Sequence, residues 1–276
     1  MEMPMSIFSD EERLLAQAMI DLSHCNPFNQ ERIDGERKIL GDRAVNTDRF
    51  WSWHIDSPGR RANTLQIQEM ARPLLTSMRN KVIAQPSHSE ADKIIYRDIV
   101  LYSLYHRYSD YLQSMIEQTI NDRNSSTTAV PFYDELCAEA RYYFDVQDAS
   151  FTSLERLPHV LSIGFQLKRA FHFIYHSFVG NSHATAQLRA AVWQSIVTHN
   201  TRRYSLGLYE RMANIPTLIC GPSGTGKELV ARAIGLSRYI PFDPKRKCFE
   251  QNFMESFYPL CLSALANSVI ESELFG

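Results

Sequence analysis

Hydrophobic residues recur at helical spacing through most of the first 178 residues. Between positions 95 and 116, apolar and aromatic side chains return every three or four residues, which predicts one long amphipathic helix. The members of this stripe are Ile95, Ile99, Tyr102, Tyr105, Tyr108, Leu112 and Ile116. The same spacing predicts further helices over Leu14 to Leu22, Tyr133 to Phe144 and Leu161 to Phe178.

Start signals support two of these helices. Ser9 is followed three residues later by Glu12, which is the pattern of a capping box. A similar signal runs from Ser87 to Glu90, directly after the helix-breaking Pro86. The polar run from Asn121 to Thr128 is the best candidate for a linker, within a predicted linker region of 121–130.

The pattern changes near Gly180. A helix predicted to begin at Asn181 and Ser182 is followed by a short apolar segment, a glycine-rich turn and another helix. The predicted elements are a helix with Leu188, Val192 and Ile196 on its stripe, a strand at 216–220, a helix at 229–236, a loop at 239–255, a strand at 257–262 and a helix at 266–275. This order predicts an α-helical N-terminal region followed by a partial α/β P-loop domain.

Composition and charge limit the classes of protein. With 276 residues and a formal net charge of -2, the chain has room for one or two domains and carries no general basic surface for nucleic acid. No apolar run is long enough to cross a bilayer, and the acidic N-terminus lacks the apolar core of a signal peptide. The five cysteines are scattered, which favours reduced thiols in a cytoplasmic protein and argues against a zinc site.

The glycine-rich turn is the strongest chemical signal in the chain. It reads Gly221, Pro222, Ser223, Gly224, Thr225, Gly226, Lys227 and Glu228. Glycines allow the backbone N–H groups to point inward at phosphate oxygens, the following helix adds its positive end, and Lys227 would reach the β- and γ-phosphates. The bare pattern occurs by chance in roughly one chain in ten of this length. The pattern alone is therefore moderate evidence, and its position between an apolar segment and a helix is what makes a P-loop the prediction.

Glu228 departs from the common P-loop, which has Ser or Thr after the lysine to hold magnesium. A carboxylate suits the N-terminus of a helix in any case. The alternative is that the metal is held differently, by Glu228 or by acidic residues elsewhere.

The stretch GPSGTGKELVARAIG resembles the Walker A region of sigma-54-dependent transcription activators, the bacterial enhancer-binding AAA+ ATPases, in which Glu usually follows the lysine. Two further segments resemble the same family in the same order. Residues 270–276, IESELFG, are similar to the segment that leads into the family's sigma-contacting loop, and Val179 to Ser182 is similar to the entry of its ATPase domain. The resemblance covers about residues 171–276.

The resemblance implies a helical regulatory or sensory region over 1–170 and a truncated AAA+ sigma-54-interaction domain over 171–276. It implies that Gly221 to Glu228 bind the phosphates of ATP, with Mg²⁺, and that the backbone near Val179 and Gly180 lies against the adenine. It also implies sigma-54 RNA polymerase and DNA as partners of the intact assembly, and a homo-oligomer.

The sequence up to Gly276 shows no Walker B pair, sensor, arginine finger or DNA-binding helix-turn-helix. Acidic residues of that kind polarise the attacking water and complete the magnesium site. The expectation is therefore a chain that binds ATP without hydrolysing it at a useful rate. The alternative function is a helical sensory or protein-interaction module that carries an inert ATPase remnant. An unrelated P-loop kinase is disfavoured by Glu228.

Other candidates have simpler explanations. His172 and His176 have the spacing of metal ligands but lack a third ligand, so helix packing is favoured. Core packing is also the default for the cluster of Trp51, Trp53 and His54, and solvation for the basic run 245–247. The tyrosines between 96 and 111 predict a half-buried helix face or a dimerisation surface.

Overall fold

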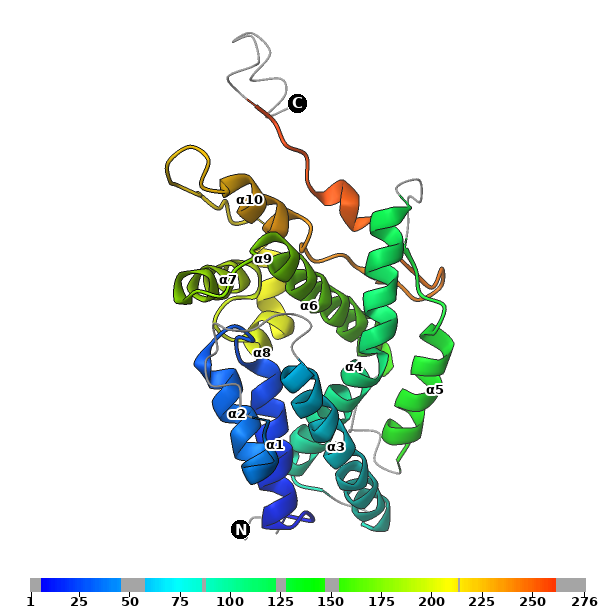
Figure 1. Cartoon of the computed structure of the whole chain (residues 1–276). Helices are drawn as coiled ribbons and strands as arrows, with labels where there is room; N and C mark the ends of the chain where they lie inside the picture. Colours follow the sequence, from blue (N-terminus) through cyan, green and yellow to red (C-terminus); the bar gives the residue numbers. More distant parts are fainter. Residues whose placement is uncertain are drawn as a thin grey trace.

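The computed structural model describes residues 6–45, 58–85, 88–122, 128–146, 154–212 and 214–261, which are mainly helical (Figure 1). The longer helices are α1 (Asp10–His24), α2 (Gln30–Leu40), α3 (Pro58–Ala84), α4 (Glu90–Asn121), α5 (Tyr133–Phe144), α6 (Leu157–Ser177), α7 (His183–Val197) and α10 (Lys227–Gly235). The short turns are η1 (Gly41–Arg43), η4 (Leu154–Arg156), α8 (Thr201–Arg203), η5 (Tyr204–Leu208), α9 (Tyr209–Met212) and η6 (Phe253–Ser256). No helix in the described ranges is long and apolar enough to cross a membrane.

The cap signals explain where two helices begin. The Ser9 side chain accepts from the N–H of Glu12, and the Glu12 carboxylate accepts from the N–H of Ser9, so the predicted capping box is confirmed. α4 is capped by Ser89, which accepts from the N–H of Asp92. Ser87, the predicted start of this signal, lies outside the described residues.

α4 is the central helix of the body, and it packs against α1, α3, α5 and α6. Its predicted stripe is confirmed as the packing face, with Ile99, Leu112 and Ile116 all buried. The tyrosines on this face are anchored, since the Tyr96 hydroxyl donates to the carbonyl of Tyr143 at 2.9 Å and the Tyr108 ring stacks on Phe132. The face is therefore filled by the core of the same chain.

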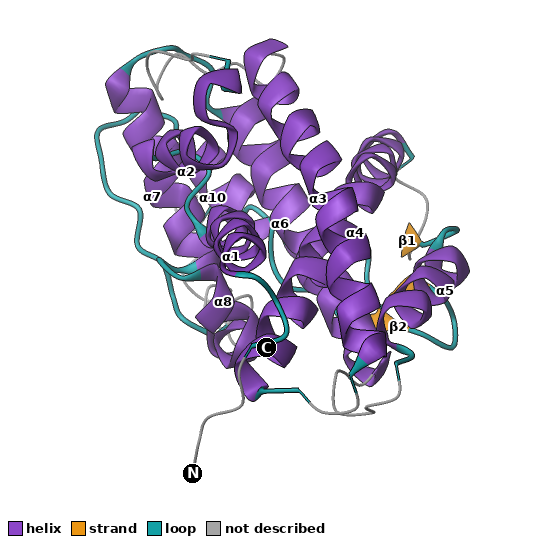
Figure 2. Cartoon of the chain, turned by 90° about the horizontal axis from the view of Figure 1, so that it is seen from below, coloured by secondary structure: helices purple, strands orange, loops and turns teal. Residues whose placement is uncertain are grey.

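A small antiparallel sheet lies at one edge, beside α5 (Figure 2). Its strands are β1 (Thr128–Ala129), β2 (Phe242–Asp243) and β3 (Cys248–Phe249), in the order β1-β3-β2. Thr128 pairs with Phe249, and Phe242 pairs with Phe249 from the other side. The segment 239–255, expected to be a loop, thus contains a hairpin that joins the C-terminal part to the helical body.

The expected α/β layering is not present in the described residues, where the only sheet is this antiparallel one. The strand predicted at 216–220 is wrong, because this segment forms no strand pairing within the described residues, and Leu218 is 88% exposed. The strand predicted at 257–262 is wrong over 257–261, and residue 262 and the helix predicted at 266–275 lie outside the described residues. A strand needs a neighbour for its backbone groups, and an apolar run alone does not supply one.

The helical body and the C-terminal part share one hydrophobic core. Phe165 of α6 stacks on Phe249 of β3 with ring centroids 4.2 Å apart, and Tyr133 of α5 lies 4.6 Å from Phe242. The predicted boundary near residue 170 falls inside α6. A division into two domains therefore stays a prediction.

Candidate phosphate-binding loop

The candidate site is the loop from Gly221 to Gly226 and the first turn of α10. Gly224 and Gly226 have φ angles of 78° and 83°, in the left-handed region that glycine adopts without a steric penalty. Gly226 is the N-cap of α10, so Lys227 and Glu228 begin the helix, which starts two residues earlier than predicted. The glycines therefore curl the chain into the N-terminus of α10, as the pattern predicts (Figure 1).

The loop leaves several backbone donors unused. Within the described residues, the N–H groups of Gly224, Gly226, Lys227 and Glu228 donate to no backbone carbonyl. The Lys227 ammonium donates to the carbonyls of Gly221 at 2.9 Å and Pro222 at 2.7 Å. A cation and free N–H groups thus meet at one helix N-terminus, a combination that fits a phosphate group.

The loop is accessible to a ligand from solvent. Residues 221–225 are exposed, and Lys227 is half-buried. Glu228 lies in the first turn, where its charge complements the helix dipole. The described residues contain no group of three or more His, Cys, Asp or Glu side chains that could hold a metal. The role of Glu228 toward Mg²⁺ stays a prediction.

Arg169 holds the opposite end of α10. This α6 side chain is fully buried, and its guanidinium donates to the carbonyls of Leu236 at 2.8 Å and Arg238 at 2.7 Å. It lies over the ring of Phe165 at 4.8 Å and that of Phe253 at 5.3 Å. Burial lowers the pKa of Arg169 to about 9, so it remains charged at pH 7. A cation beside the C-terminus of α10 interacts favourably with the helix dipole and holds this end of α10 in place.

Gln166, one turn earlier on α6, extends this anchor. Its amide donates to the carbonyl of Ser237 at 2.9 Å and to the hydroxyl of Tyr204 at 2.7 Å. Sequence reasoning missed both α6 residues, because a polar residue on an amphipathic helix is normally assigned to solvent. The signal that could have found them is their place among large apolar residues, since Arg169 follows Phe165 by four positions.

Val179 and Gly180, predicted near the adenine, lie just after α6. Val179 is 85% exposed. The carbonyl of Gly180 accepts from the Arg189 guanidinium of α7 at 3.0 Å, which ties this segment to α7. Their role toward a nucleotide is not tested and stays a prediction.

The histidine pair packs within the body. The rings of His172 and His176 stack with centroids 4.0 Å apart, and His172 Nδ1 lies 3.0 Å from the amide of Gln113. Burial lowers the pKa of His172 to about 4, and the neighbouring His176 adds to the shift. The described part of the chain contains no third side chain that would complete a metal site beside these rings, and the preference for helix packing stays a prediction.

The basic run 245–247 forms the turn of the β2–β3 hairpin. The Asp243 carboxylate accepts from the N–H groups of Lys245 and Arg246, and Lys247 forms an ion pair with Asp134 of α5. The turn is thus exposed and organised by nearby carboxylates. The cluster of Trp51, Trp53 and His54 lies outside the described residues.

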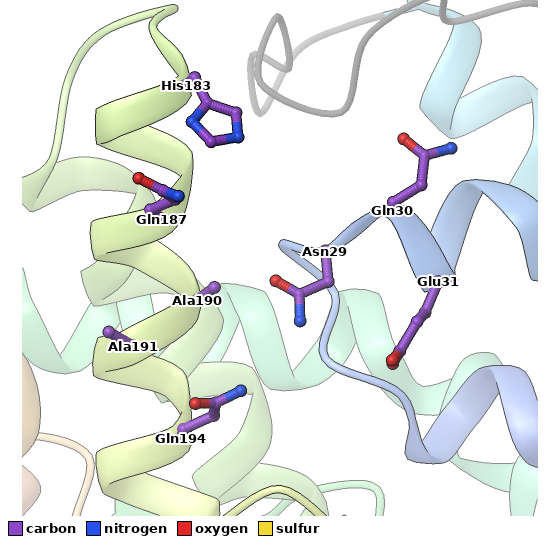
Figure 3. Close-up of a pocket in the computed structure, with 8 residues that line it drawn as sticks. All are labelled: Asn29, Gln30, Glu31, His183, Gln187, Ala190, Ala191 and Gln194. Atoms are coloured by element: carbon purple, nitrogen blue, oxygen red, sulfur yellow. The ribbon is translucent and has the colours of Figure 1, made fainter.

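A shallow cleft of about 460 Å³ lies between α7 and the start of α2 (Figure 3). Amide side chains dominate it, with Asn29 and Gln30 opposite Gln187 and Gln194. Glu31 is its one carboxylate. This composition is typical of a solvated surface and singles out no ligand.

The glycine loop, its lysine and the following helix lie in the order that a P-loop requires. A comparison with known families goes further, because residues 199–276 match the family described as the Sigma-54 interaction domain. This match confirms the resemblance for the part of the chain that contains the loop and α10. Val179 and Gly180 fall outside the matched residues. No curated protein and no solved structure matches the chain.

Proposed function

We propose that the chain is a transcription regulator of the sigma-54-activator type, in which a helical body carries an ATP-binding P-loop. The main support for this proposal is the loop within the matched residues 199–276. Its free N–H groups and Lys227 meet at the start of α10. ATP is the nucleotide of the family. Its phosphates would accept from the N–H groups of Gly224 to Glu228, and Lys227 would move from the carbonyls of Gly221 and Pro222 to the β- and γ-oxygens.

Further parts of the proposal come from the family alone. They are a cytoplasmic location, contact with sigma-54 RNA polymerase at DNA, and assembly into a homo-oligomer. Mg²⁺ would enter with the nucleotide. Glu228, in the first turn of α10, is the nearest carboxylate in sequence to the phosphate position.

A second function is favoured by a different observation. Leu218 is 88% exposed and Ile215 is 56% exposed, so among the described residues no sheet supports the segment before the loop as one does in an α/β domain. The helical body would then be the functional part, acting as a sensory or protein-interaction module, and the ATPase segment would be inert.

Nucleotide binding separates the two functions. A fluorescent ATP analogue is titrated with the full chain and with Lys227→Ala, and Lys245→Ala serves as a matched control on another exposed loop. The proposal predicts saturable binding that Lys227→Ala weakens by about tenfold or more, the scale of one charge-assisted hydrogen bond. Lys245→Ala should bind as the unaltered chain does. Absence of saturable binding, or an equal loss in both variants, would support the inert segment instead.

A further inference from the structure

The helical body contains a cavity of about 1100 Å³ that lies beside α4 and α6. Side chains of α1, α2, α3 and α7 also line it, so most helices of the body contribute to its walls. This volume is at the upper end for small-molecule sites, which measure about 300–1,000 Å³. The cavity does not include the glycine loop.

Three aromatic side chains with polar atoms stand together on the α4 wall. The ring of His106 lies 4.4 Å from that of Tyr102 and 5.3 Å from that of Tyr105, centroid to centroid. Neither tyrosine hydroxyl nor either His106 nitrogen has a hydrogen-bond partner among the described residues, although all three side chains line the cavity. Tyr105 and His106 are half-buried, and none of these polar atoms is enclosed without a partner. They are therefore accessible and available to a molecule that enters the cavity.

Glycine on the facing helix permits this arrangement. A Cβ atom at Gly164 of α6 would lie only 3.1 Å from Cδ2 of Tyr105. The Tyr105 ring thus rests against the backbone of α6, which fixes its position before any ligand enters. A preset ring of this kind lowers the entropic cost of binding.

Arg32, Arg97, Asp98 and Arg202 of the wall are held in ion pairs, whereas Asp110, Glu117, Glu155 and Arg156 are exposed to solvent. Arg32 pairs with Glu36 at 2.6 Å. Asp98 accepts from Arg97 at 2.8 Å and from Arg202 at 2.9 Å. A charged ligand would have to compete with these pairs or remain unpaired in the interior, which is costly.

The three aromatic groups are themselves neutral at pH 7. Burial lowers the pKa of His106 to about 3, with Arg32 and Lys168 adding to the effect. Burial raises the pKa of Tyr102 and of Tyr105 to about 12. The α4 wall of the cavity thus offers neutral rings, hydroxyl groups and an imidazole that can both donate and accept.

We propose that this cavity binds an uncharged aromatic small molecule that carries a hydrogen-bond donor and acceptor, held by Tyr102, Tyr105 and His106. Ring edges and faces select an aromatic ligand, the unused polar atoms select hydrogen-bonding substituents, and the paired charges disfavour an ion. The site is separate from the glycine loop, so the proposal stands whether or not the chain binds ATP.

Three probes of nearly equal shape test this selectivity. Benzamide is neutral and aromatic, benzoate has the same ring with a charge, and cyclohexanecarboxamide has the same amide without the aromatic ring. Ligand-observed NMR titration of the full chain should show saturable binding of benzamide, at least about threefold tighter than that of either other probe, the scale of one hydrogen bond or ring contact. Binding of benzoate as tight as that of benzamide, or no binding of any probe, would overturn the proposal.

Variants that remove single polar groups locate the binding. Tyr105→Phe and His106→Phe keep a ring while deleting the unused atoms, and each should weaken benzamide binding by about threefold to tenfold. Tyr111→Phe is the matched control, because Tyr111 lies on the same helix, is 52% exposed and does not line the cavity. Circular dichroism verifies that all variants are folded. Unchanged affinity in both cavity variants, or an equal loss in Tyr111→Phe, would contradict the assignment.

Discussion

The helices around α4 and the segment before α10 differ in how far their apolar side chains are buried and in whether their backbone N–H groups are hydrogen-bonded. The body buries its apolar side chains in a core shared by α1, α3, α5 and α6, with Tyr96, Ile99 and Val100 all at 0% exposure. The segment 214–226 is mostly exposed, and the N–H groups at its end have no backbone acceptor in the part of the chain that the structure describes. A helix satisfies its own backbone, whereas an extended segment depends on a partner. The body therefore supplies stability, and the loop offers groups to a ligand.

Two apolar side chains give the largest expected contrast. Phe165 is 1% exposed and stacks on Phe249, whereas Leu218 is 88% exposed. Phe165→Ala should lower the free energy of unfolding by about 3–5 kcal/mol, since it opens a cavity in the core. Leu218→Ala should change it by less than about 0.5 kcal/mol. Urea denaturation followed by circular dichroism measures both, and similar losses would erase the distinction between the two regions.

Two cations at opposite ends of α10 provide the next contrast. Arg169→Met deletes the hydrogen bonds to the carbonyls of Leu236 and Arg238 and leaves the Leu236 carbonyl buried without this donor, so we expect a loss of about 3 kcal/mol. Lys227→Ala removes only contacts on the exposed loop and should cost less than about 0.5 kcal/mol. The same denaturation measurement applies. A large loss in Lys227→Ala would mean that the loop is part of the stabilising core.

A third contrast, smaller for each group, concerns the pH dependence of His106 and His172. Burial lowers the pKa of His106 to about 3 and that of His172 to about 4, below the value of about 6.5 in the unfolded chain. The unfolded state therefore takes up protons first as the pH falls. Stability should be fully present above about pH 6.5 and decline below it, by about 1.4 kcal/mol per pH unit for each histidine.

Denaturation at several values between about pH 7 and about pH 5 measures this decline. His106→Gln should reduce the slope by the share of one group, because glutamine does not titrate. A slope that is the same in both chains would show that His106 does not titrate at a lowered pKa.

The sequence predicts the helices of this chain better than it predicts which distant segments pack or pair with one another. The stripe of α4, the capping box at Ser9 and the bounds of α5 follow from local spacing and local hydrogen bonds, and the structure confirms them. The apolar run at 216–220 matches a buried strand, but strand formation depends on pairing far along the chain. The glycine loop is also local, so its position before α10 was predictable.

The sequence could not predict the anchoring of α10 by Arg169 or the cavity, because both depend on contacts between residues far apart in the chain. Arg169 contacts Leu236 and Arg238 across 67 and 69 residues. The cavity depends on side chains from several helices that no spacing rule brings together. Only the packed arrangement shows that a cation on α6 fixes the helix that follows the loop.

The most direct test of the central claim is hydrogen exchange of the full chain with and without ATP and Mg²⁺. If the free N–H groups of Gly224 to Glu228 donate to phosphates, exchange should slow in peptides that cover 221–228 and remain unchanged in α4. The slowing should disappear in Lys227→Ala. An ATP effect that is absent from this loop, or that appears only in the helical body, would contradict the account.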